Sequence, residues 1–130
     1  MEQFQTPFSE QLPNRPPLLT IGGAVSVAAA AETAITSINA NRFGYLLELE
    51  AICTVASTAA GTWTLRSGVA GTVRLVLQQP VNPSVVGTRY CWAFPMPWKT
   101  DAQGGQFTIQ PSAATLGTWI FFANGFHSAL

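Results

Sequence analysis

The sequence predicts an all-β protein: an antiparallel β-sandwich of about eight short strands, jelly-roll-like, with an extended N-terminal arm. Runs rich in β-branched and aromatic residues recur along the chain, and several of them alternate apolar with polar residues. Glycine, proline and asparagine separate these runs at short intervals, and no stretch has the periodicity of a long helix. Short strands with such frequent turns are typical of antiparallel sandwiches, and their number fits a jelly roll.

The N-terminal segment stands apart from the rest of the chain. Four prolines break any helix or ladder there: Pro7, Pro13, Pro16 and Pro17. The 130 residues therefore divide into an extended arm, residues 1–17, and one sandwich domain, residues 18–130. Three apolar residues recur in the arm at fourfold spacing: Phe4, Phe8 and Leu12. Disordered tails are poor in such residues, which favours an arm that docks into a neighbouring subunit; a frayed terminus is the simpler alternative.

The domain is expected to begin with two short strands. Residues 18–27 form the first, with a bulge or bend at Gly22-Gly23. Residues 31–38 form the second, with Thr33 and Ile35 on one face. Residues 28–34 could instead be helical on propensity alone.

The longest strand-like run, residues 43–57, is expected to be the central strand. Its odd positions are apolar: Tyr45, Leu47, Leu49, Ala51, Cys53 and Val55. Its even positions are mixed and include Glu48 and Glu50. A strand points alternate side chains to opposite faces, so we expect the odd face in the core.

Four later apolar runs each follow a Gly-Thr pair: Gly61-Thr62, Gly71-Thr72, Gly87-Thr88 and Gly117-Thr118. Glycine supplies turn geometry and threonine begins a strand well, so each pair predicts a strand start. Residues 67–71 should connect two antiparallel strands, and residues 106–110 should form another strand. The last strand is expected over residues 115–123, closed by Asn124-Gly125. Six aromatic residues are expected to supply the core: Trp63, Trp92, Phe94, Phe107, Trp119 and Phe121.

Charge is scarce in this chain. It is 48% hydrophobic but only 9% charged, against about 25% in an ordinary soluble domain, and its net charge is zero. Either the protein is poorly soluble alone, or partners cover much of its surface, which is the interpretation we favour. The cations are scattered singly, which argues against nucleic-acid binding. No secretory signal is visible, and the apolar run at residues 24–31 is too short for a membrane span.

Candidates for chemistry are few, and we expect neither an enzyme nor a metal or cofactor site. Glu48 and Glu50 share a strand face about 7 Å apart, a spacing that paired acids of a glycosidase could use. The simpler interpretation is a solvated or salt-bridged face, opposite Arg66 or Arg74. His127 is the single histidine and lies in an expected C-terminal tail, where neither a triad nor a metal site would have its other members.

The two cysteines, Cys53 and Cys91, each lie inside a strand-like run. We expect two buried free thiols, with a bridge between neighbouring strands as the alternative. Met96 and Trp98 follow Pro95 and are therefore expected beyond the strand proper. They either cap the open end of the sandwich or form an exposed patch for a neighbouring subunit, since Trp and Met are enriched at interface cores.

The C-terminal half, from Gly61 to Phe126, carries a resemblance. Its segments TLRSGVAGTVRLVLQ and FPMPWKTDAQGGQFTIQPSAATLGTWIFFANGF resemble small virion proteins of tailed bacteriophages, above all head decoration (cement) or related auxiliary structural proteins. The resemblance rests on the Gly-Thr strand starts, the FP-x-P break, the KTDA turn and the closing NGF, none of which is catalytic. It implies a β-sandwich of the virion that oligomerises, often as a trimer, and binds the major capsid protein or other virion proteins. A carbohydrate- or receptor-binding module of a phage particle, with Trp63 or Trp98 as an exposed platform, is the alternative function.

Overall fold

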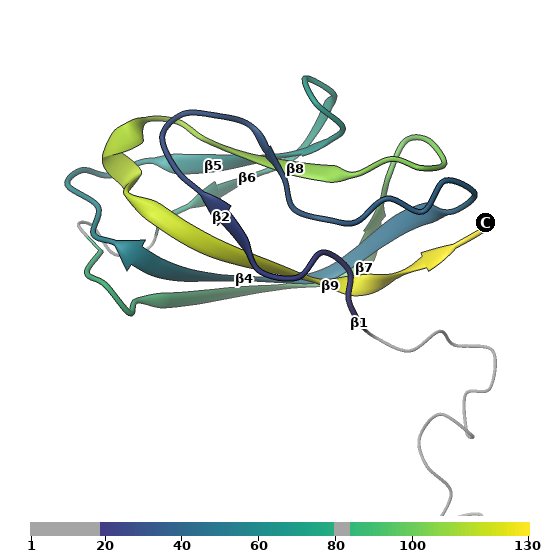
Figure 1. The fold of residues 1–130 in the computed structure, drawn as a ribbon, viewed down its shortest axis with the longest axis horizontal. Coiled ribbons are helices and arrows are strands. Elements are labelled where there is room, and N and C mark those ends of the chain that lie inside the picture. The colour runs from purple at the N-terminus through teal and green to yellow at the C-terminus, as the bar shows by residue number, and fades with distance from the viewer. Residues whose placement is uncertain (1–18, 80–83) are drawn as a thin grey trace, which may run out of the picture.

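Two antiparallel sheets lie one above the other in the computed structural model, which describes residues 19–79 and 84–130 (Figure 1). Sheet A has the order β1 (Leu19–Thr20), β9 (Thr118–Ser128), β4 (Phe43–Val55), β7 (Arg89–Lys99), and β2 (Val25–Val27) also pairs with β9. Sheet B has the order β3 (Thr33–Ala34), β8 (Phe107–Pro111), β5 (Thr62–Ser67), β6 (Thr72–Gln78). The 3-10 turn η2 (Ala114–Leu116) precedes β9. The prediction of an all-β, sandwich-like protein is confirmed, and the predicted N-terminal arm lies outside the described residues.

The core between the sheets is largely aromatic, as the sequence predicts. Four of the six expected rings are fully buried: Trp63, Phe107, Trp119 and Phe121. Trp92 and Phe94 are half-buried at the margin of the core. The indole of Trp63, from sheet B, meets two rings of sheet A edge to face, with centroids 5.1 Å from Trp119 and 5.6 Å from Phe121. Edge-to-face contacts are favourable beyond the area they bury, so this cluster binds the two sheets together.

The central strand is β4, as predicted, but its odd face is in the core over only part of its length. Leu49, Ala51 and Cys53 are buried as expected. The pairing of β4 with both neighbours shifts between Leu46 and Glu48, and a bulge of this kind exchanges the two faces. Upstream of it Leu46 is buried, whereas Tyr45 and Leu47 are half-buried. The prediction is therefore wrong for Tyr45 and Leu47. It is also wrong for Val55, which is 55% exposed beyond a second shift.

Strand β9 is longer than predicted. It does not stop at Ala123 but continues through Asn124-Gly125 to Ser128, so His127 lies in a strand and not in a tail. Gly125 explains the continuation, because a Cβ at this position would lie 1.8 Å from the carbonyl oxygen of Tyr45. Glycine lets β9 pass close to β4 beside the bulge. Here glycine permits close pairing rather than ending the strand.

Strand β7 accommodates two prolines without ending. Its pairing with β4 jumps from Ala93, opposite Glu48, to Trp98, opposite Leu46. Residues 94–97 of β7 therefore have no partner residue on β4, and prolines are tolerated at such interruptions of an edge strand. The prediction that Met96 and Trp98 lie beyond the strand is wrong, because both lie within β7 and Trp98 pairs with Leu46.

The other strand predictions are mostly confirmed. Gly22-Gly23 divides the first strand into β1 and β2, and strands begin at Thr62, Thr72 and Thr118. The Gly87-Thr88 start is displaced by one residue, to Arg89. The second strand is much shorter than residues 31–38, since only Thr33–Ala34 pairs, and the helical alternative is not adopted.

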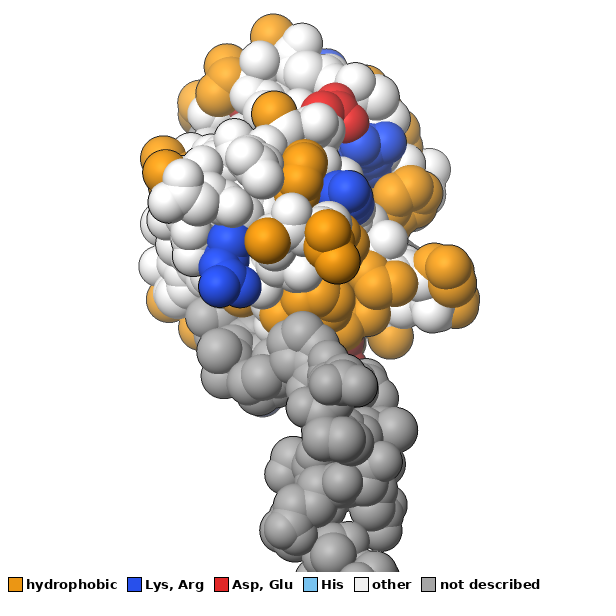
Figure 2. All heavy atoms as spheres, turned by 90° about the vertical axis from the view of Figure 1, so that its right-hand side faces the viewer, with side chains coloured by type: hydrophobic (Ala, Val, Ile, Leu, Met, Phe, Trp, Pro, Cys, Tyr) orange, Lys and Arg blue, Asp and Glu red, His pale blue; other side chains and the backbone are white. Residues whose placement is uncertain are grey.

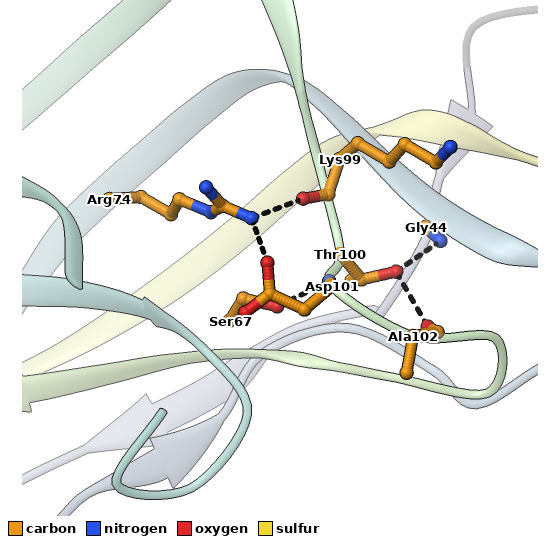
Figure 3. A network of polar contacts seen from close by, with 7 residues as sticks. All are labelled: Gly44, Ser67, Arg74, Lys99, Thr100, Asp101 and Ala102. Carbon is orange, nitrogen blue, oxygen red and sulfur yellow. Dashed lines mark hydrogen bonds and ion pairs between the residues drawn. The ribbon is translucent and has the colours of Figure 1, made fainter. Parts of the chain in front are cut away.

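A polar network closes one end of the sandwich (Figure 3). The Arg74 guanidinium of β6 binds the carboxylate of Asp101 and donates to the carbonyl oxygen of Lys99 at 3.1 Å. The backbone N–H of Asp101 donates to Ser67 Oγ at 2.8 Å, and that of Gly44 donates to Thr100 Oγ1 at 3.0 Å. Through these contacts the end of β7 is tied to both sheets.

Candidate docking face on sheet A

The outer face of sheet A is lined by large apolar side chains. In β9 the buried residues Trp119, Phe121 and Ala123 alternate with half-buried ones. Alternation therefore points Ile120 and Phe122 away from the core. Ile52 of β4 is the register partner of Ile120, and it is also half-buried. Every strand in residues 19–79 and 84–130 belongs to sheet A or sheet B, so no strand of this part of the chain covers these side chains.

Aromatic rings continue this face toward the C-terminal end of β9. The ring of Phe126 stacks on that of Tyr45, with centroids 4.8 Å apart and 12° between the ring planes. Lys99 Nζ lies 4.1 Å from the ring centroid of Phe43, a cation–π contact. Figure 2 looks at this end of the molecule, and hydrophobic side chains gather on its lower half, the side of sheet A. We call the surface formed by Ile52, Ile120, Phe122, Tyr45, Phe126 and Phe43 the apolar face. Glu48, Glu50 and Asn124 lie on the same side of the sheet, between its two ends.

The outer face of sheet B is polar along β5 and β8, although Val73 and Val76 of β6 are 50% and 53% exposed beside them. Alternation places polar residues of β5 and β8 on it: Thr62, Thr64, Arg66, Thr108 and Gln110. Arg66 donates to Gln110 Oε1, and the Thr108 hydroxyl donates to the carboxylate of Glu32. That hydroxyl is the main reason why the pKa of Glu32 lies below its ordinary value; the Ala70 N–H and the charge of Arg66 act in the same direction, against partial burial.

The two candidate catalytic acids lie on the outer side of sheet A. Glu50 forms an ion pair with Arg89, with Arg89 Nη2 2.8 Å from Glu50 Oε2. Glu48 is paired in register with Ala93 and Asn124. The prediction that Arg66 or Arg74 lies opposite Glu48 and Glu50 is wrong. Arg66 binds Gln110, and Arg74 binds Asp101. Sequence alone could not place Arg89 opposite this segment, because that requires the pairing of β4 with β7.

The two cysteines have different environments. Both are free, which confirms that part of the prediction, but only Cys53 is buried and Cys91 is exposed. Cys53 is on the core side of β4, whereas Cys91 pairs with Glu50 on the outer side, so the alternative bridge does not form. Burial raises the pKa of the Cys53 thiol. Partial burial also raises the pKa of Cys91, and the negative charges of Glu48 and Glu50 raise it further.

His127 lies beside Ser37. Its Nε2 lies 3.4 Å from Ser37 Oγ. No cluster of three or more His, Cys, Asp and Glu residues suited to a metal ion occurs among the residues that the structure describes. The described part of the chain also contains no helix with the length and apolar character that a membrane crossing needs.

The predicted interface residues fall into three groups. Phe4, Phe8 and Leu12 lie outside the described residues. Met96 is 76% exposed on edge strand β7, as an interface residue would be in the free subunit. Trp98 is half-buried, with its ring 6.5 Å from that of Phe94.

Sequence reasoning missed Ile120 and Phe122 as surface residues. The signal was present, because the run WIFFA in β9 is apolar at every position and a strand can place only half of such a run in one core. A strand apolar on both faces is typical of a buried strand. In this protein the second face of β9 is the outside of the sheet.

Comparisons of the chain with protein families, with curated proteins and with solved structures found no match.

Proposed function

We propose that this protein is a non-enzymatic structural protein of a virus particle, which oligomerises and binds the capsid surface to stabilise or decorate the virion. The apolar face of sheet A carries this proposal. A soluble antiparallel sheet ordinarily turns polar residues outward, as β5 and β8 of sheet B do, and contiguous apolar surfaces mark sites of protein association. In a chain with only six acidic and six basic residues, burial of this face against other subunits is the simplest role for it.

The strand order supports the jelly-roll-like sandwich within this proposal. Taking β1 and β2 as one broken strand, the sheets read first, eighth, third, sixth and second, seventh, fourth, fifth. This is the order that two interleaved Greek keys produce, and jelly rolls build viral capsid domains. They also build lectin domains, so strand order supports the architecture and the apolar face supports the role.

The carbohydrate-binding alternative has less support. A sugar-stacking platform needs an aromatic ring open to solvent, but Trp63 is fully buried in the core. Trp98 is half-buried and packs on Phe94. The expectation that Trp63 could form an exposed platform is therefore wrong.

Native mass spectrometry of the full chain at micromolar concentration tests the proposal. We expect a closed homo-oligomer, with a trimer as the expectation from the resemblance. Phe122→Lys should shift the protein to monomers, because it places a charge in the apolar face. Thr64→Lys, the matched change on the outer face of sheet B, should leave the oligomer intact. A monomeric wild-type protein would refute the proposal, and immunogold labelling of purified particles would test its place in the virion.

A further inference from the structure

We propose that a second copy of this chain pairs antiparallel with the free edge of β6, so that sheet B of one copy continues into sheet B of the other. The partner is therefore the same strand of another molecule, related by a two-fold axis. The inference goes beyond the proposed function, because it concerns sheet B and does not use the apolar face of sheet A.

The backbone of β6 is paired on one side. β6 is the last strand in the order of sheet B, and within residues 19–79 and 84–130 it pairs with β5 alone. The N–H of Gln79 donates to the carbonyl oxygen of Gly61 on the β5 side, at 3.3 Å. Alternation along the strand then points the N–H and C=O groups of Val76 and Gln78 away from β5. These groups are where a further strand would bind.

The other ends of the two sheets carry features that hinder such pairing. β1, β2 and β3 have only two or three residues each. β7 carries Pro95 and Pro97, and proline has no N–H to donate. Short edge strands and prolines are the usual protection of a sheet against edge-to-edge pairing. β6 has seven residues and no proline, so among the described strands it is the long edge that lacks this protection.

The pairing of β6 with β5 shows which part of the edge is regular. Their register shifts once, between Leu65 and Arg66, and it is regular from Leu75 to Gln78. A shift of this kind twists an edge and disrupts an added ladder. We therefore place the contact with the second copy at residues 75–78.

Charge does not protect this edge either. The charged residue of β6 is Arg74, and its guanidinium is held by the carboxylate of Asp101 and the carbonyl oxygen of Lys99 at the end of β7. The Arg74 side chain is only 23% exposed, so its charge is neutralised there and does not stand at the edge. Val76, the register partner of Thr64, is apolar and 53% exposed. An uncharged edge with an exposed β-branched residue favours a strand of the same kind.

A second copy of β6 fits this edge because the strand complements itself. A two-fold axis at Leu77 places Val76 of one copy opposite Gln78 of the other, and both residues point their backbone groups across the junction. The two Val76 side chains then lie on the same outer face, diagonally across the axis. The chain has no net charge, so no overall repulsion opposes the approach of two copies.

The small size of this contact decides when it forms. Pairing over residues 75–78 buries far less than the roughly 1,200 Å² of a stable interface. We expect a dissociation constant of about 1 mM, so that the pair does not form at micromolar concentration. Where copies are held side by side, effective concentrations reach about 1 mM and a contact of this strength links neighbours.

Amide hydrogen exchange of the full chain, measured by NMR at about 20 μM and about 1 mM, tests the inference. The chain carries Phe122→Lys, so that the apolar face does not contribute. About half of the chains should be paired at the higher concentration, so exchange of the Val76 and Gln78 amides should slow about twofold. Protection of both amides at both concentrations would mean that the same chain covers the edge, and it would overturn the inference. Equal exposure at both concentrations would overturn it too.

Two changes at Val76 separate edge pairing from other contacts. Val76→Pro removes the outward N–H, and an edge strand tolerates proline where its N–H faces solvent. Val76→Lys keeps the backbone and places a charge at the edge. Each, added to Phe122→Lys, should abolish the dimer that sedimentation equilibrium detects at about 1 mM. Val85→Lys is the control and should not, because Val85 is 67% exposed but lies outside the strands.

A dimer that survives both changes at Val76 would contradict pairing through β6. The two proposals fail separately. Monomeric wild-type protein at micromolar concentration refutes the proposed function, whereas exchange at Val76 and Gln78 that does not depend on concentration refutes only the pairing of β6.

Discussion

The two sheets of this protein share one core but differ in how polar their outer faces are. Along β5 and β8 sheet B covers its outside with threonine, glutamine and arginine side chains, with hydrogen bonds from Arg66 to Gln110 and from Thr108 to Glu32, while β6 adds the exposed Val73 and Val76. Sheet A covers much of its outside with isoleucine and aromatic side chains, although Glu48, Glu50 and Asn124 lie among them and Glu50 forms an ion pair with Arg89. Folding requires one apolar face per sheet. The second apolar face of sheet A is therefore not explained by folding, and association with other chains is the explanation we propose.

The largest effects should come from the shared core, where the two sheets are equivalent. Trp63→Ala in sheet B and Trp119→Ala in sheet A should each lower the free energy of unfolding by about 3–5 kcal/mol, because each removes a fully buried ring. Urea denaturation followed by circular dichroism measures both. A loss below about 1 kcal/mol for either variant would mean that its ring contributes little, and the sheets would then differ in their cores as well.

A smaller loss is expected where the bulge of β4 decides which residues of sheet A face outward. Gly125→Ala should lower the free energy of unfolding by about 1–3 kcal/mol, the usual range for overpacking, because the new Cβ would lie 1.8 Å from the Tyr45 carbonyl oxygen. Gly44→Ala is the matched control, since its Cβ would meet its nearest neighbour, a methyl group of Thr100, at 3.4 Å. Equal stability of the two variants in a thermal melt would contradict the close approach of β9 to β4.

A still smaller effect should distinguish the polar outer face of sheet B. The pKa of Glu32 is lowered in the folded protein. The stability it contributes is therefore present above its ordinary pKa of 4.5 and is lost as the pH falls through the folded value. Glu32→Gln should be less stable than wild type at pH 7, and the difference should shrink below pH 4.5. A difference independent of pH in urea titrations at both ends of this range would assign the effect to packing and not to charge.

The smallest effect concerns a thiol on the outside of sheet A. The charges of Glu48 and Glu50 contribute to the raised pKa of Cys91, so Glu48→Gln should lower that pKa. Iodoacetamide should then alkylate Cys91 about twofold faster at pH 8, because the thiolate is the reactive form. Glu32→Gln, on the other sheet, serves as the control and should not change the rate. An unchanged rate in Glu48→Gln would indicate that the carboxylate is too far from the sulfur to act on it.

Much of the strand content was predictable because its signals are local. Turn glycines followed by threonine located the starts of β5, β6 and β9, and alternation identified β4 as the central strand. Local signals failed at three places: the bulge at Leu46/Glu48, the passage of β9 through Gly125, and the continuation of β7 past Pro95 and Pro97. In each case the outcome depends on the strand that lies alongside.

The candidate site was less predictable than the strands. The sequence indicated that the surface would be poor in charge and that partners would cover it, but the predicted contact residues came from the arm and from β7. The apolar face requires Ile52 of β4 and Ile120 of β9 to be register partners, and these residues are far apart in the chain.

Composition and periodicity determined that this chain folds as an all-β protein with an aromatic core and few surface charges, since each of these follows from residue type and spacing of two. Only the tertiary structure decided which side of each strand faces the core past a bulge, that Arg89 binds Glu50, and that apolar residues of β4 and β9 form one surface. Pairing between strands that are far apart in the sequence fixes these features. The local pattern of one strand does not say which strand will lie beside it.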